Sequence, residues 1–409
     1  MNVLVLNAGS SSLKFQLIAT DLDRIRQDKD ERLCRGSIDH IGKEAEFKVA
    51  IGTDQHCRKT EVPDLHSALE AVLNWIASEK GGVPGINRVA DVHAVGHRVV
   101  HGGERFSESA LITDEVFEGI RECIDLAPLH NPNNIDGIMA ARRLFGSETP
   151  QVAVFDTAFH HTLPRHAYLY ALPYELYERH RIRRYGFHGT SHRYVAHRYR
   201  LLRRLRREQT NIISLHLGNG CSATAIKGGY SVETSMGMTP LEGLVMGTRS
   251  GDVDPSLVQI IASREDLSSQ EVDSLLNTRS GLLGVSGFSN DMRELQGSRE
   301  PLADLAIAIF CHRAKKYIGS YLAAMGGADA VIFTGGIGEH SPQVRSQICA
   351  GLEWAGLHLE AARNNAAIGF EAQLTTDSST LAAFCIPTDE ELLIAQDTVR
   401  CLLREPHPS

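Results

Sequence analysis

Two arginines in this sequence stand where a charged side chain would meet an anion. Arg98 follows an apolar run and precedes the pair Gly102-Gly103, and Arg249 lies among small residues in segment 246–252. Because burying an unpaired arginine is costly, an arginine flanked by apolar residues predicts a carboxylate or phosphate partner. A plain surface charge would give the same pattern at Arg98, and that alternative stays open.

Acidic residues stand just after two apolar, strand-like runs. Asp156 follows one run directly, and Glu390 lies shortly after the other. Proteins of the α/β class gather site residues at the carboxyl ends of strands, and Glu390 is suited to hold a metal ion or its water shell. The structural alternatives are that Asp156 caps the next turn and that Thr388 begins a capping box with Glu391.

Histidines gather in segment 185–192, which reads Tyr-Gly-Phe-His-Gly-Thr-Ser-His. His188 and His192 have a spacing that could bind zinc on a helix. However, the glutamate of the HExxH motif is absent, and Gly189 weakens a helix at that point. A histidine that donates a hydrogen bond to an anion is therefore the favoured interpretation.

An apolar strand runs into a glycine-rich turn three times, in segments 3–17, 212–226 and 331–342. In the first two, alternating residues follow the turn, which predicts a hairpin and excludes a P-loop, whose lysine must open a helix. In the third, Ser341 can cap a helix that starts at Pro342. Such turns bring backbone N–H groups close to a ligand and bind phosphate. An ordinary hairpin turn is the alternative for any one of them; together, with Asn7, Lys14 and Asn219 in or beside the first two, they favour a nucleotide site.

These residues need a scaffold of strands and helices. Segments 65–77 and 303–325 have apolar residues at three- and four-residue spacing and are predicted to be helices. Helices that alternate with strands indicate an α/β protein, and the hairpins make its sheets mixed. The 409 residues are too many for one core, so we expect two domains, which the two similar hairpins suggest are related.

Composition narrows the function classes. The formal net charge of −8 argues against a nucleic-acid or anionic-membrane surface. No apolar run approaches the ~18 residues of a membrane span, and Met1 leads directly into a strand-like run instead of a leader. The eight cysteines are scattered singly. We therefore expect a soluble cytoplasmic protein without nucleic-acid or membrane partners. Phosphate-binding turns, arginines, histidines and carboxylates able to hold Mg²⁺ are the parts of a phosphoryl-transfer site.

The chain closely resembles the acetate kinase family. The matching stretches are 7–14, 96–103, 127–132, 154–160, 185–192, 216–220, 233–251, 286–293, 333–339 and 387–392. The resemblance implies the fold of acetate and sugar kinases, Hsp70 and actin. That fold has two duplicated actin-like (ribonuclease H-like) domains with mixed sheets flanked by helices, and an active site in the interdomain cleft. The implied domains are 1–155 with 388–409, and 156–387, the latter binding nucleotide; a homodimer is also implied.

The resemblance also assigns roles to residues. The implied catalytic residues are Arg98, Asp156, His188 and Arg249. The acid substrate is bound by Arg98, Val100, Leu129, His130, Phe187 and Pro240. The nucleotide is bound by Ser12, Lys14, His216, Leu217, Gly218, Asn219, Gly220, Asp291, Met292, Arg293, Gly336, Ile337, Gly338, Glu339 and His340. Asn7 and Glu390 hold the metal.

The implied activity is reversible transfer of a phosphoryl group from ATP to acetate, giving ADP and acetyl phosphate, with Mg²⁺ or Mn²⁺. Direct in-line transfer is favoured over a phosphoenzyme on Glu390. The alternatives are a propionate or other short-chain fatty acid kinase, a nucleotide-gated binding protein of the actin/Hsp70 type, and a phosphatase. The binding protein would not require Arg98 and Arg249, and the phosphatase would need a placed water and an acidic base.

Two positions depart from the family pattern. The family usually has asparagine where this chain has His340 and Asp389. The first departure bears on nucleotide selectivity, and the second on local charge and metal affinity. Neither removes a residue expected to take part in the chemistry.

Overall fold

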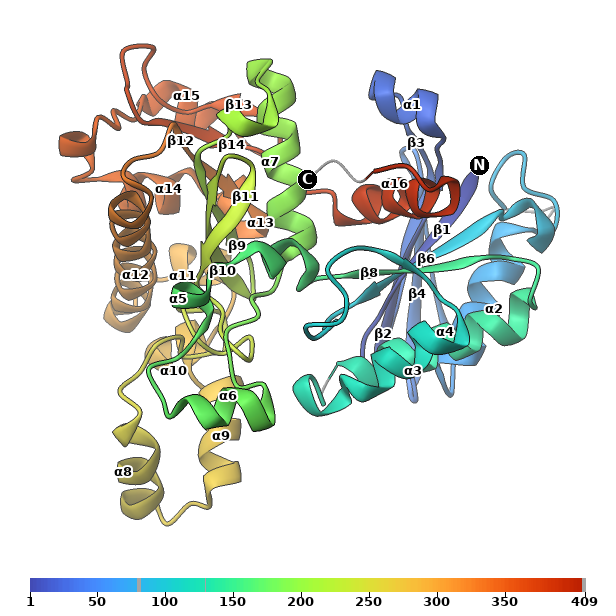
Figure 1. Cartoon of the computed structure of the whole chain (residues 1–409), viewed down its shortest axis with the longest axis horizontal. Coiled ribbons are helices and arrows are strands. Elements are labelled where there is room, and N and C mark those ends of the chain that lie inside the picture. Colours follow the sequence, from blue (N-terminus) through green and yellow to red (C-terminus); the bar gives the residue numbers. More distant parts are fainter. Residues whose placement is uncertain (79–81, 129, 407–409) are drawn as a thin grey trace. The chain divides into compact units, whose positions relative to one another are not determined.

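The computed structural model describes residues 1–78, 82–128 and 130–406. The chain divides into two compact units, each built around one mixed sheet (Figure 1). Unit 1 comprises Met1–Ala158 and the segment that begins at Asp389, and unit 2 comprises Phe159–Thr388. The domain limits 155/156 and 387/388 expected from the sequence stay a prediction.

The sheet of unit 1 has the strand order β5-β4-β3-β2-β1-β6-β8-β7. Its strands are β1 (Asn2–Ala8), β2 (Ser12–Ala19), β3 (Glu31–Asp39), β4 (Glu44–Ile51), β5 (Asp54–Glu61), β6 (Ala94–Val99), β7 (Ala110–Leu111) and β8 (Gln151–Phe155). Strands β1, β6 and β8 are parallel neighbours, whereas β1 to β5 form an antiparallel meander. The carboxyl ends of β1, β6 and β8 therefore lie at one edge of the sheet.

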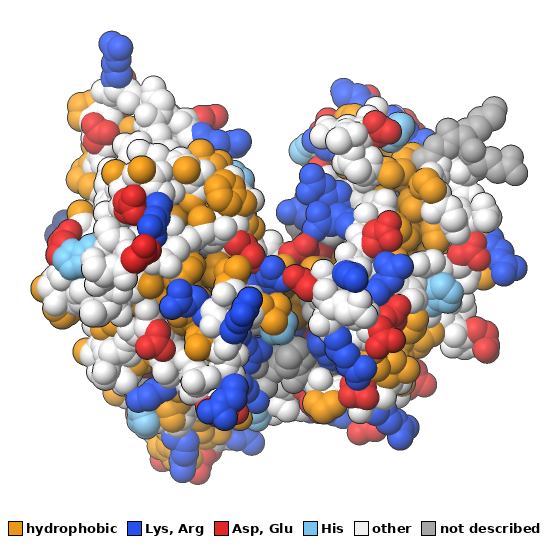
Figure 2. Space-filling model, turned by 90° about the horizontal axis from the view of Figure 1, so that it is seen from above, with side chains coloured by type: hydrophobic (Ala, Val, Ile, Leu, Met, Phe, Trp, Pro, Cys, Tyr) orange, Lys and Arg blue, Asp and Glu red, His pale blue; other side chains and the backbone are white. Residues whose placement is uncertain are grey.

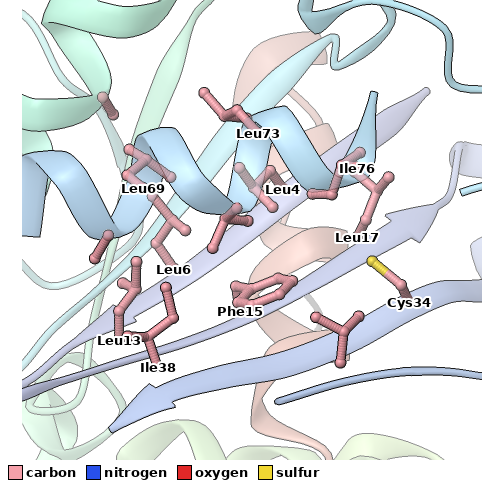
Figure 3. Packing of buried hydrophobic residues seen from close by; sticks show 14 of the residues in the cluster. Leu4, Leu6, Leu13, Phe15, Leu17, Cys34, Ile38, Leu69, Leu73 and Ile76 are labelled. Atoms are coloured by element: carbon pink, nitrogen blue, oxygen red, sulfur yellow. The ribbon is translucent and has the colours of Figure 1, made fainter. Parts of the chain in front are cut away.

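Helices cover both faces of this sheet. They are α1 (Leu22–Gln27), α2 (Leu65–Ile76), α3 (Asp114–Glu122), α4 (Asn131–Phe145) and α16 (Glu390–Leu403). Figure 3 shows Leu69, Leu73 and Ile76 of α2 packed against side chains of β1 and β2, such as Leu4 and Phe15. Ile394, Ala395 and Val399 of α16 pack in a separate cluster with Val3, Val5 and Val154. Alternate apolar side chains of β1 thus belong to two hydrophobic cores, one on each face of the sheet.

The sheet of unit 2 has the strand order β11-β10-β9-β12-β14-β13. Its strands are β9 (Ile212–Leu217), β10 (Cys221–Lys227), β11 (Tyr230–Thr234), β12 (Ala330–Thr334), β13 (Ala372–Gln373) and β14 (Ala382–Cys385). Its helices are α5 (Arg165–Tyr168), α6 (Tyr174–His180), α7 (Gly189–Arg203), α8 (Ser256–Glu265), α9 (Ser269–Thr278), α10 (Gly281–Ser286), α11 (Met292–Gly297), α12 (Pro301–Met325), α13 (Gly335–His340), α14 (Pro342–Cys349) and α15 (Ala361–Ala366). Short 3₁₀ turns span Val89–Asp91, Ile124–Leu126, Ala158–Thr162, Arg207–Gln209 and Glu353–Ala355. Within the described ranges, none of the helices combines the length and apolar character needed to cross a membrane.

The two sheets share one topology. In unit 1, β1 pairs antiparallel with β2 and parallel with β6, which pairs parallel with β8. In unit 2, β9 pairs antiparallel with β10 and parallel with β12, which pairs parallel with β14. The order β3-β2-β1-β6-β8 thus repeats as β11-β10-β9-β12-β14. The predicted α/β class with duplicated mixed sheets is confirmed.

The predicted local elements are confirmed with two corrections. Both glycine hairpins form, and the two predicted helices are α2 and α12. Ser341 caps α14 by accepting a hydrogen bond from the Val344 N–H at 3.3 Å. The glycine segment before it was wrongly taken for a turn, because it is the short helix α13. The capping box at Thr388 was also wrong, since the residue that caps α16 is Asp389.

Candidate functional site

Unit 1 joins Arg98 and Asp156 at the carboxyl ends of two adjacent parallel strands. Arg98 lies near the end of β6, and Asp156 directly follows β8. The Arg98 Nε lies 3.1 Å from Asp156 Oδ1, and its Nη2 lies 2.5 Å from Oδ2. Only 1% of the Asp156 surface is exposed. Arg98 therefore has the carboxylate partner that its apolar surroundings predicted, and it is not a plain surface charge.

The charge of Arg98 is secured by its neighbours. Burial by itself would lower the pKa of Arg98, but the negative charges of Asp156 and Glu390 outweigh it and raise that pKa. Glu390, the first residue of α16, has its Oε2 3.8 Å from Arg98 Nε. Asp156, Arg98 and Glu390 are thus brought together from three separate parts of the sequence.

Asp389 has a structural task that explains why an acid is tolerated there. Its Oδ1 accepts a hydrogen bond from the Leu392 N–H at 3.0 Å, and its other oxygen pairs with Arg32. Asparagine and aspartate both cap helices well. The extra negative charge relative to the family pattern is therefore matched by Arg32.

The turn between β1 and β2 carries Asn7, Ser12 and Lys14. Asn7 and Lys14 are cross-strand partners, and the Gly9 N–H donates to the Ser12 carbonyl at 2.8 Å. Asn134 of α4 ties this turn to the end of β6, because its amide bonds both the Ala8 carbonyl and the Val100 N–H. Asn7 is therefore held on the same sheet edge as Arg98.

Val100 and His130 lie beside this edge. Asn131, the first residue of α4, exchanges hydrogen bonds with the backbone of His101 through both its side-chain amide atoms, at 3.2 and 3.0 Å. This pairing brings the segment that holds His130 to the segment that follows Val100. Leu129, expected in the acid pocket, lies outside the described residues.

Unit 2 brings His188, Gly220 and Arg249 to one place. A methyl group added at Gly220 would lie 3.4 Å from His188 Cε1, 3.5 Å from its Nε2 and 3.6 Å from Arg249 Nη1. His188 immediately precedes α7 in a left-handed conformation, with φ of 54°. Phe187 before it is buried. A histidine and an arginine thus flank a position where the backbone has no side chain.

The His188 ring is held on two sides. Its Nδ1 lies 2.9 Å from Ser222 Oγ, and its ring stacks on His216 with centroids 4.3 Å apart. His216 Nδ1 in turn lies 2.8 Å from Ser191 Oγ. Because both ring nitrogens of His192 bond serine hydroxyls, that residue is engaged in the core of unit 2.

Arg249 differs from Arg98 in its partners. Its Nη1 donates to the Pro240 carbonyl at 3.2 Å and lies 3.7 Å from the Met246 sulfur. Among the described residues it forms no ion pair with a carboxylate. Burial lowers the pKa of its guanidinium, which still leaves it charged at neutral pH. A half-buried arginine paired only with neutral groups is poised to bind an anion.

The segments expected at the nucleotide converge within unit 2. A side chain on Gly335 would meet the Leu217 backbone oxygen at 2.7 Å, so the start of α13 approaches the β9–β10 turn closely. Asn219 in that turn accepts a hydrogen bond from the Asn290 amide at 3.0 Å. Next to Asn290, Asp291 caps α11 and pairs with the exposed Arg293 at 2.6 Å, which lowers its pKa to about 2. The Met292 side chain is buried.

Glu339 and His340 contribute to the shape of α13. The Glu339 Oε1 accepts hydrogen bonds from the N–H groups of Gly335 and Thr388, at 2.8 and 3.1 Å. The Glu339 carboxylate therefore supports the loop. The exposed His340 has its Nδ1 3.1 Å from the Gly336 carbonyl, an intrahelical contact. Gly336, Ile337 and Gly338 complete this short helix.

Sequence reasoning missed Arg345, a fully buried residue of α14. All five of its N–H donors are used, and every acceptor is neutral. Two of them are the carbonyls of Gly338 and Glu339, at 2.8 and 3.1 Å from Nη1. The others are the Asn364 side-chain and backbone oxygens and the Ala367 carbonyl. No local pattern marks this residue, because its acceptors come from two other segments, residues 338–339 and 364–367.

Asn7 and Glu390 offer oxygen ligands that suit Mg²⁺. Within the described ranges, no group of three or more His, Cys, Asp or Glu side chains could hold a metal ion. Mg²⁺ commonly binds through one or two carboxylates and is completed by waters and substrate phosphates. One carboxylate and one amide oxygen therefore fit a magnesium ion delivered with a nucleotide.

Comparisons with known proteins agree along the whole chain. Residues 2–396 match the model of the acetokinase family. An acetate kinase of Solibacter usitatus is 65% identical, with 100% of both chains covered. The crystal structure of Porphyromonas gingivalis acetate kinase is 42% identical with a TM-score of 0.92, covering 98% of this chain and 99% of that one. A propionate kinase structure from Francisella tularensis is 41% identical with a TM-score of 0.88, covering 97% and 98%.

Proposed function

Because the chain belongs to the acetokinase family, we propose that it transfers a phosphoryl group reversibly between ATP and acetate. The products in the forward direction are acetyl phosphate and ADP. The observation that carries the proposal is the approach of His188 and Arg249 to the bare backbone of Gly220. These donors and the glycine backbone are suited to a phosphoryl group with negative charge on its equatorial oxygens.

The proposed chemistry needs no general base. Free carboxylic acids titrate near ~4, so acetate is already ionised at neutral pH. An acetate oxygen attacks the γ-phosphorus in line, a new P–O bond forms, and the bond to the bridging oxygen breaks as ADP leaves with the electron pair. The barrier lies in bringing two anions together. Arg249, which is paired only with neutral groups, stabilises the charge on the transferring group, and His188 donates a hydrogen bond to it.

Unit 1 supplies the remaining charged groups. Arg98, fixed by Asp156, attracts the carboxylate of the acid substrate. Asn7 and Glu390 would hold Mg²⁺, which would neutralise phosphate charge when bound. Mn²⁺ has similar oxygen ligands and is expected to substitute.

Nucleotide binding is assigned to backbone-rich segments and a few side chains. These are Ser12 and Lys14 of unit 1 and, in unit 2, residues 216–220, Asp291, Met292, Arg293 and residues 336–340. Glycine at several of these positions lets backbone N–H groups approach phosphates. Val100, Phe187 and Pro240, together with Leu129 and His130, are the residues that the family resemblance assigns to the acid substrate.

The partners of this protein are proposed to be its small substrates and a second copy of the chain, in the cytoplasm. Leu302, Leu305 and Ile309 of α12 are each at least 36% exposed, an apolar stripe that a second copy would cover. On the face shown in Figure 2, basic and acidic side chains are interspersed. A face that mixes both signs of charge has no large single-sign field that would attract nucleic acid or an anionic membrane.

The test of the function is ADP formation from ATP and Mg²⁺ with and without acetate. Turnover that requires acetate is expected. ADP formation that is independent of an acid would indicate a phosphatase, and nucleotide binding without turnover would indicate an actin-like binding protein. In the same assay, Glu390→Ala should weaken the response to Mg²⁺ more than nucleotide affinity. An unchanged magnesium titration with reduced activity would instead favour a phosphoenzyme on Glu390.

Propionate kinase is a second candidate, because the Francisella tularensis structure is nearly as similar as the acetate kinase structure. We expect kcat/KM to fall from acetate to propionate to butyrate, with about 10–200-fold discrimination per methylene. Val100→Ala should narrow the gap by enlarging the pocket. A wild-type preference for propionate would decide for the second candidate. An unchanged ratio in Val100→Ala would remove Val100 from the pocket.

A further inference from the structure

Three side chains of unit 2 are connected in series behind His188. Ser222 Oγ lies 2.9 Å from His188 Nδ1 and 2.7 Å from His192 Nε2. His192 Nδ1 lies 3.0 Å from Ser214 Oγ. Ser214, His192 and Ser222 are all fully buried, so water cannot replace a missing partner easily. The hydroxyl and ring N–H hydrogens of these three side chains must therefore be donated to one another or to His188.

His192 is neutral in this surrounding. Burial lowers its pKa well below the usual value, and the nearby His160 and His216 lower it further. A neutral imidazole has one N–H donor and one acceptor nitrogen. Its two serine contacts must then be one donated and one accepted hydrogen bond.

Two arrangements satisfy the His192 ring. In the first, Ser214 donates to His192 Nδ1, and His192 Nε2–H donates to Ser222. The Ser222 hydroxyl hydrogen is then left to donate to His188 Nδ1. In the second, every donor is reversed: His188 Nδ1–H donates to Ser222, Ser222 donates to His192 Nε2, and His192 Nδ1–H donates to Ser214.

Ser214, at the far end of this series of hydrogen bonds, distinguishes the two arrangements. Among the described residues, the Ser214 hydroxyl forms a hydrogen bond only with His192. In the second arrangement its own hydroxyl hydrogen would be buried without an acceptor, which is unfavourable. In the first arrangement every hydroxyl and ring nitrogen from Ser214 to His188 Nδ1 is satisfied.

We propose that Ser214, His192 and Ser222 are positioning residues that hold neutral His188 with its hydrogen on Nε2. His188 Nε2 and the adjacent Cε1 are the ring atoms nearest to a methyl group added at Gly220, a position that Arg249 Nη1 also approaches. With its hydrogen on Nε2, an uncharged His188 donates to the phosphoryl group. The reversed chain would present an acceptor lone pair to the same anion. This inference rests on the proposed function for the role of the donor, but the tautomer itself is independent of it.

The direct test is ¹⁵N NMR of the full-length protein labelled at histidine, at mildly alkaline pH. The His188 signals are identified by their loss in His188→Asn. The expected result is a pyridine-type shift for Nδ1 and a pyrrole-type shift for Nε2. The opposite pattern in the wild-type protein would overturn the proposal without any need for a variant that folds.

Ser222→Ala interrupts the series of hydrogen bonds behind His188 and removes no group proposed to contact the substrate. The Nδ1 shift of His188 should move, and kcat should fall about 10–100-fold with a much smaller change in the KM for acetate. Ser214→Ala should act in the same direction but less strongly. An unchanged His188 spectrum and unchanged kcat in Ser222→Ala would refute the positioning role.

Ser231→Ala is the matched control. Ser231 is also fully buried and lies 2.9 Å from a buried histidine, His160, whose other ring nitrogen donates to the Phe187 carbonyl. Ser231 is not part of the series of hydrogen bonds that ends at His188. Loss of its hydroxyl should therefore leave the His188 tautomer and kcat unchanged. An equal fall of kcat in Ser231→Ala would mean a general packing effect and would overturn the proposal. If the tautomer is found but no acetate-dependent turnover is seen, the proposed function fails alone.

Discussion

The two units have the same strand order but end their parallel strands differently. In unit 1, β6 and β8 end at Arg98 and Asp156, which neutralise each other. In unit 2, the matching strands β12 and β14 are followed by Gly335 and the buried Ile386. Gly335 has φ of 75° and leaves no room for a side chain against Leu217. At the carboxyl ends of these parallel strands, unit 1 thus has a pair of opposite charges, and unit 2 has backbone groups.

This difference shows that a repeated topology supplies positions rather than chemistry. The edge that carries charges needs opposite charges within reach, because a buried arginine is otherwise unstable. The edge that carries glycine needs backbone groups held in place by other residues, here Glu339 and Arg345. The four predictions below each disturb one side of this comparison.

Breaking the ion pair of unit 1 should have the largest effect. Asp156→Ala leaves Arg98 without its bidentate partner, so the free energy of unfolding should fall by about 3 kcal/mol and activity should be lost. Urea unfolding monitored by circular dichroism measures the first effect. Asp377→Ala is the control, because it removes an exposed partner of Arg363 and should lower the free energy of unfolding far less. Equal losses in both variants would show that the burial of Asp156 is unimportant.

In unit 2 the matching experiment is Arg249→Ala. It should lower kcat at least about 100-fold while stability changes little, since Arg249 is not part of an ion pair among the described residues. Arg249→Lys should rescue only partly, because a point charge does not reproduce the planar fork. Steady-state kinetics measures kcat, and thermal melts measure stability. A near-normal kcat in either variant would show that Arg249 does not take part in the reaction.

Acid should destabilise unit 2 through its buried neutral histidines. Burial lowers the pKa of His160 from 6.5 to about 4. The unfolded chain therefore binds more protons than the folded one between these values, and stability is lost as pH falls from about 6.5 to 4. His160→Gln should reduce the slope of unfolding free energy against pH by at most about 1.4 kcal/mol per unit in that window. A slope identical to the wild type would mean that His160 already titrates normally in the folded state.

The smallest effect is expected from a single methyl group. Gly220→Ala places a carbon at ordinary contact distance from His188 and Arg249, so the fold should persist while kcat/KM falls about tenfold. Gly297→Ala is the control, because a methyl group there meets no atom within 4 Å. Full activity in Gly220→Ala would show that the phosphoryl group does not approach this part of the backbone.

Much of the scaffold could be predicted from the sequence, since its signals are local. Alternation after the turns at Gly9 and Gly220 gave the two hairpins, and the spacing of apolar residues gave α2 and α12. The cost of burial suggested a carboxylate or phosphate partner for Arg98, although a plain surface charge stayed an open alternative. The identity of that partner, Asp156, could not be predicted, because it depends on the parallel pairing of β6 with β8.

The supporting residues were beyond local patterns. Ser222 reaches His188 only because β10 folds back against β9 near the start of α7. The assignment of Glu339 to the nucleotide stays a prediction, but the contacts of its carboxylate with the start of its own helix and with Thr388 could not be foreseen. The glycines of residues 335–338 predicted a turn because glycine is a poor helix former. Tertiary contacts from Arg345 and Glu339 override that propensity.

The buried Arg345 also bears on the entropy of ligand binding. A flexible glycine segment would lose about 1–2 kcal/mol of backbone freedom per residue when a ligand orders it. In α13, the carbonyls of Gly338 and Glu339 are already held by a guanidinium that has no spare donor. Opening the segment would leave the Nη1 donors of this buried guanidinium without acceptors, so the segment is ordered before any ligand arrives. A nucleotide that binds to these amides therefore meets a rigid surface, and its affinity is not reduced by the ordering of that loop.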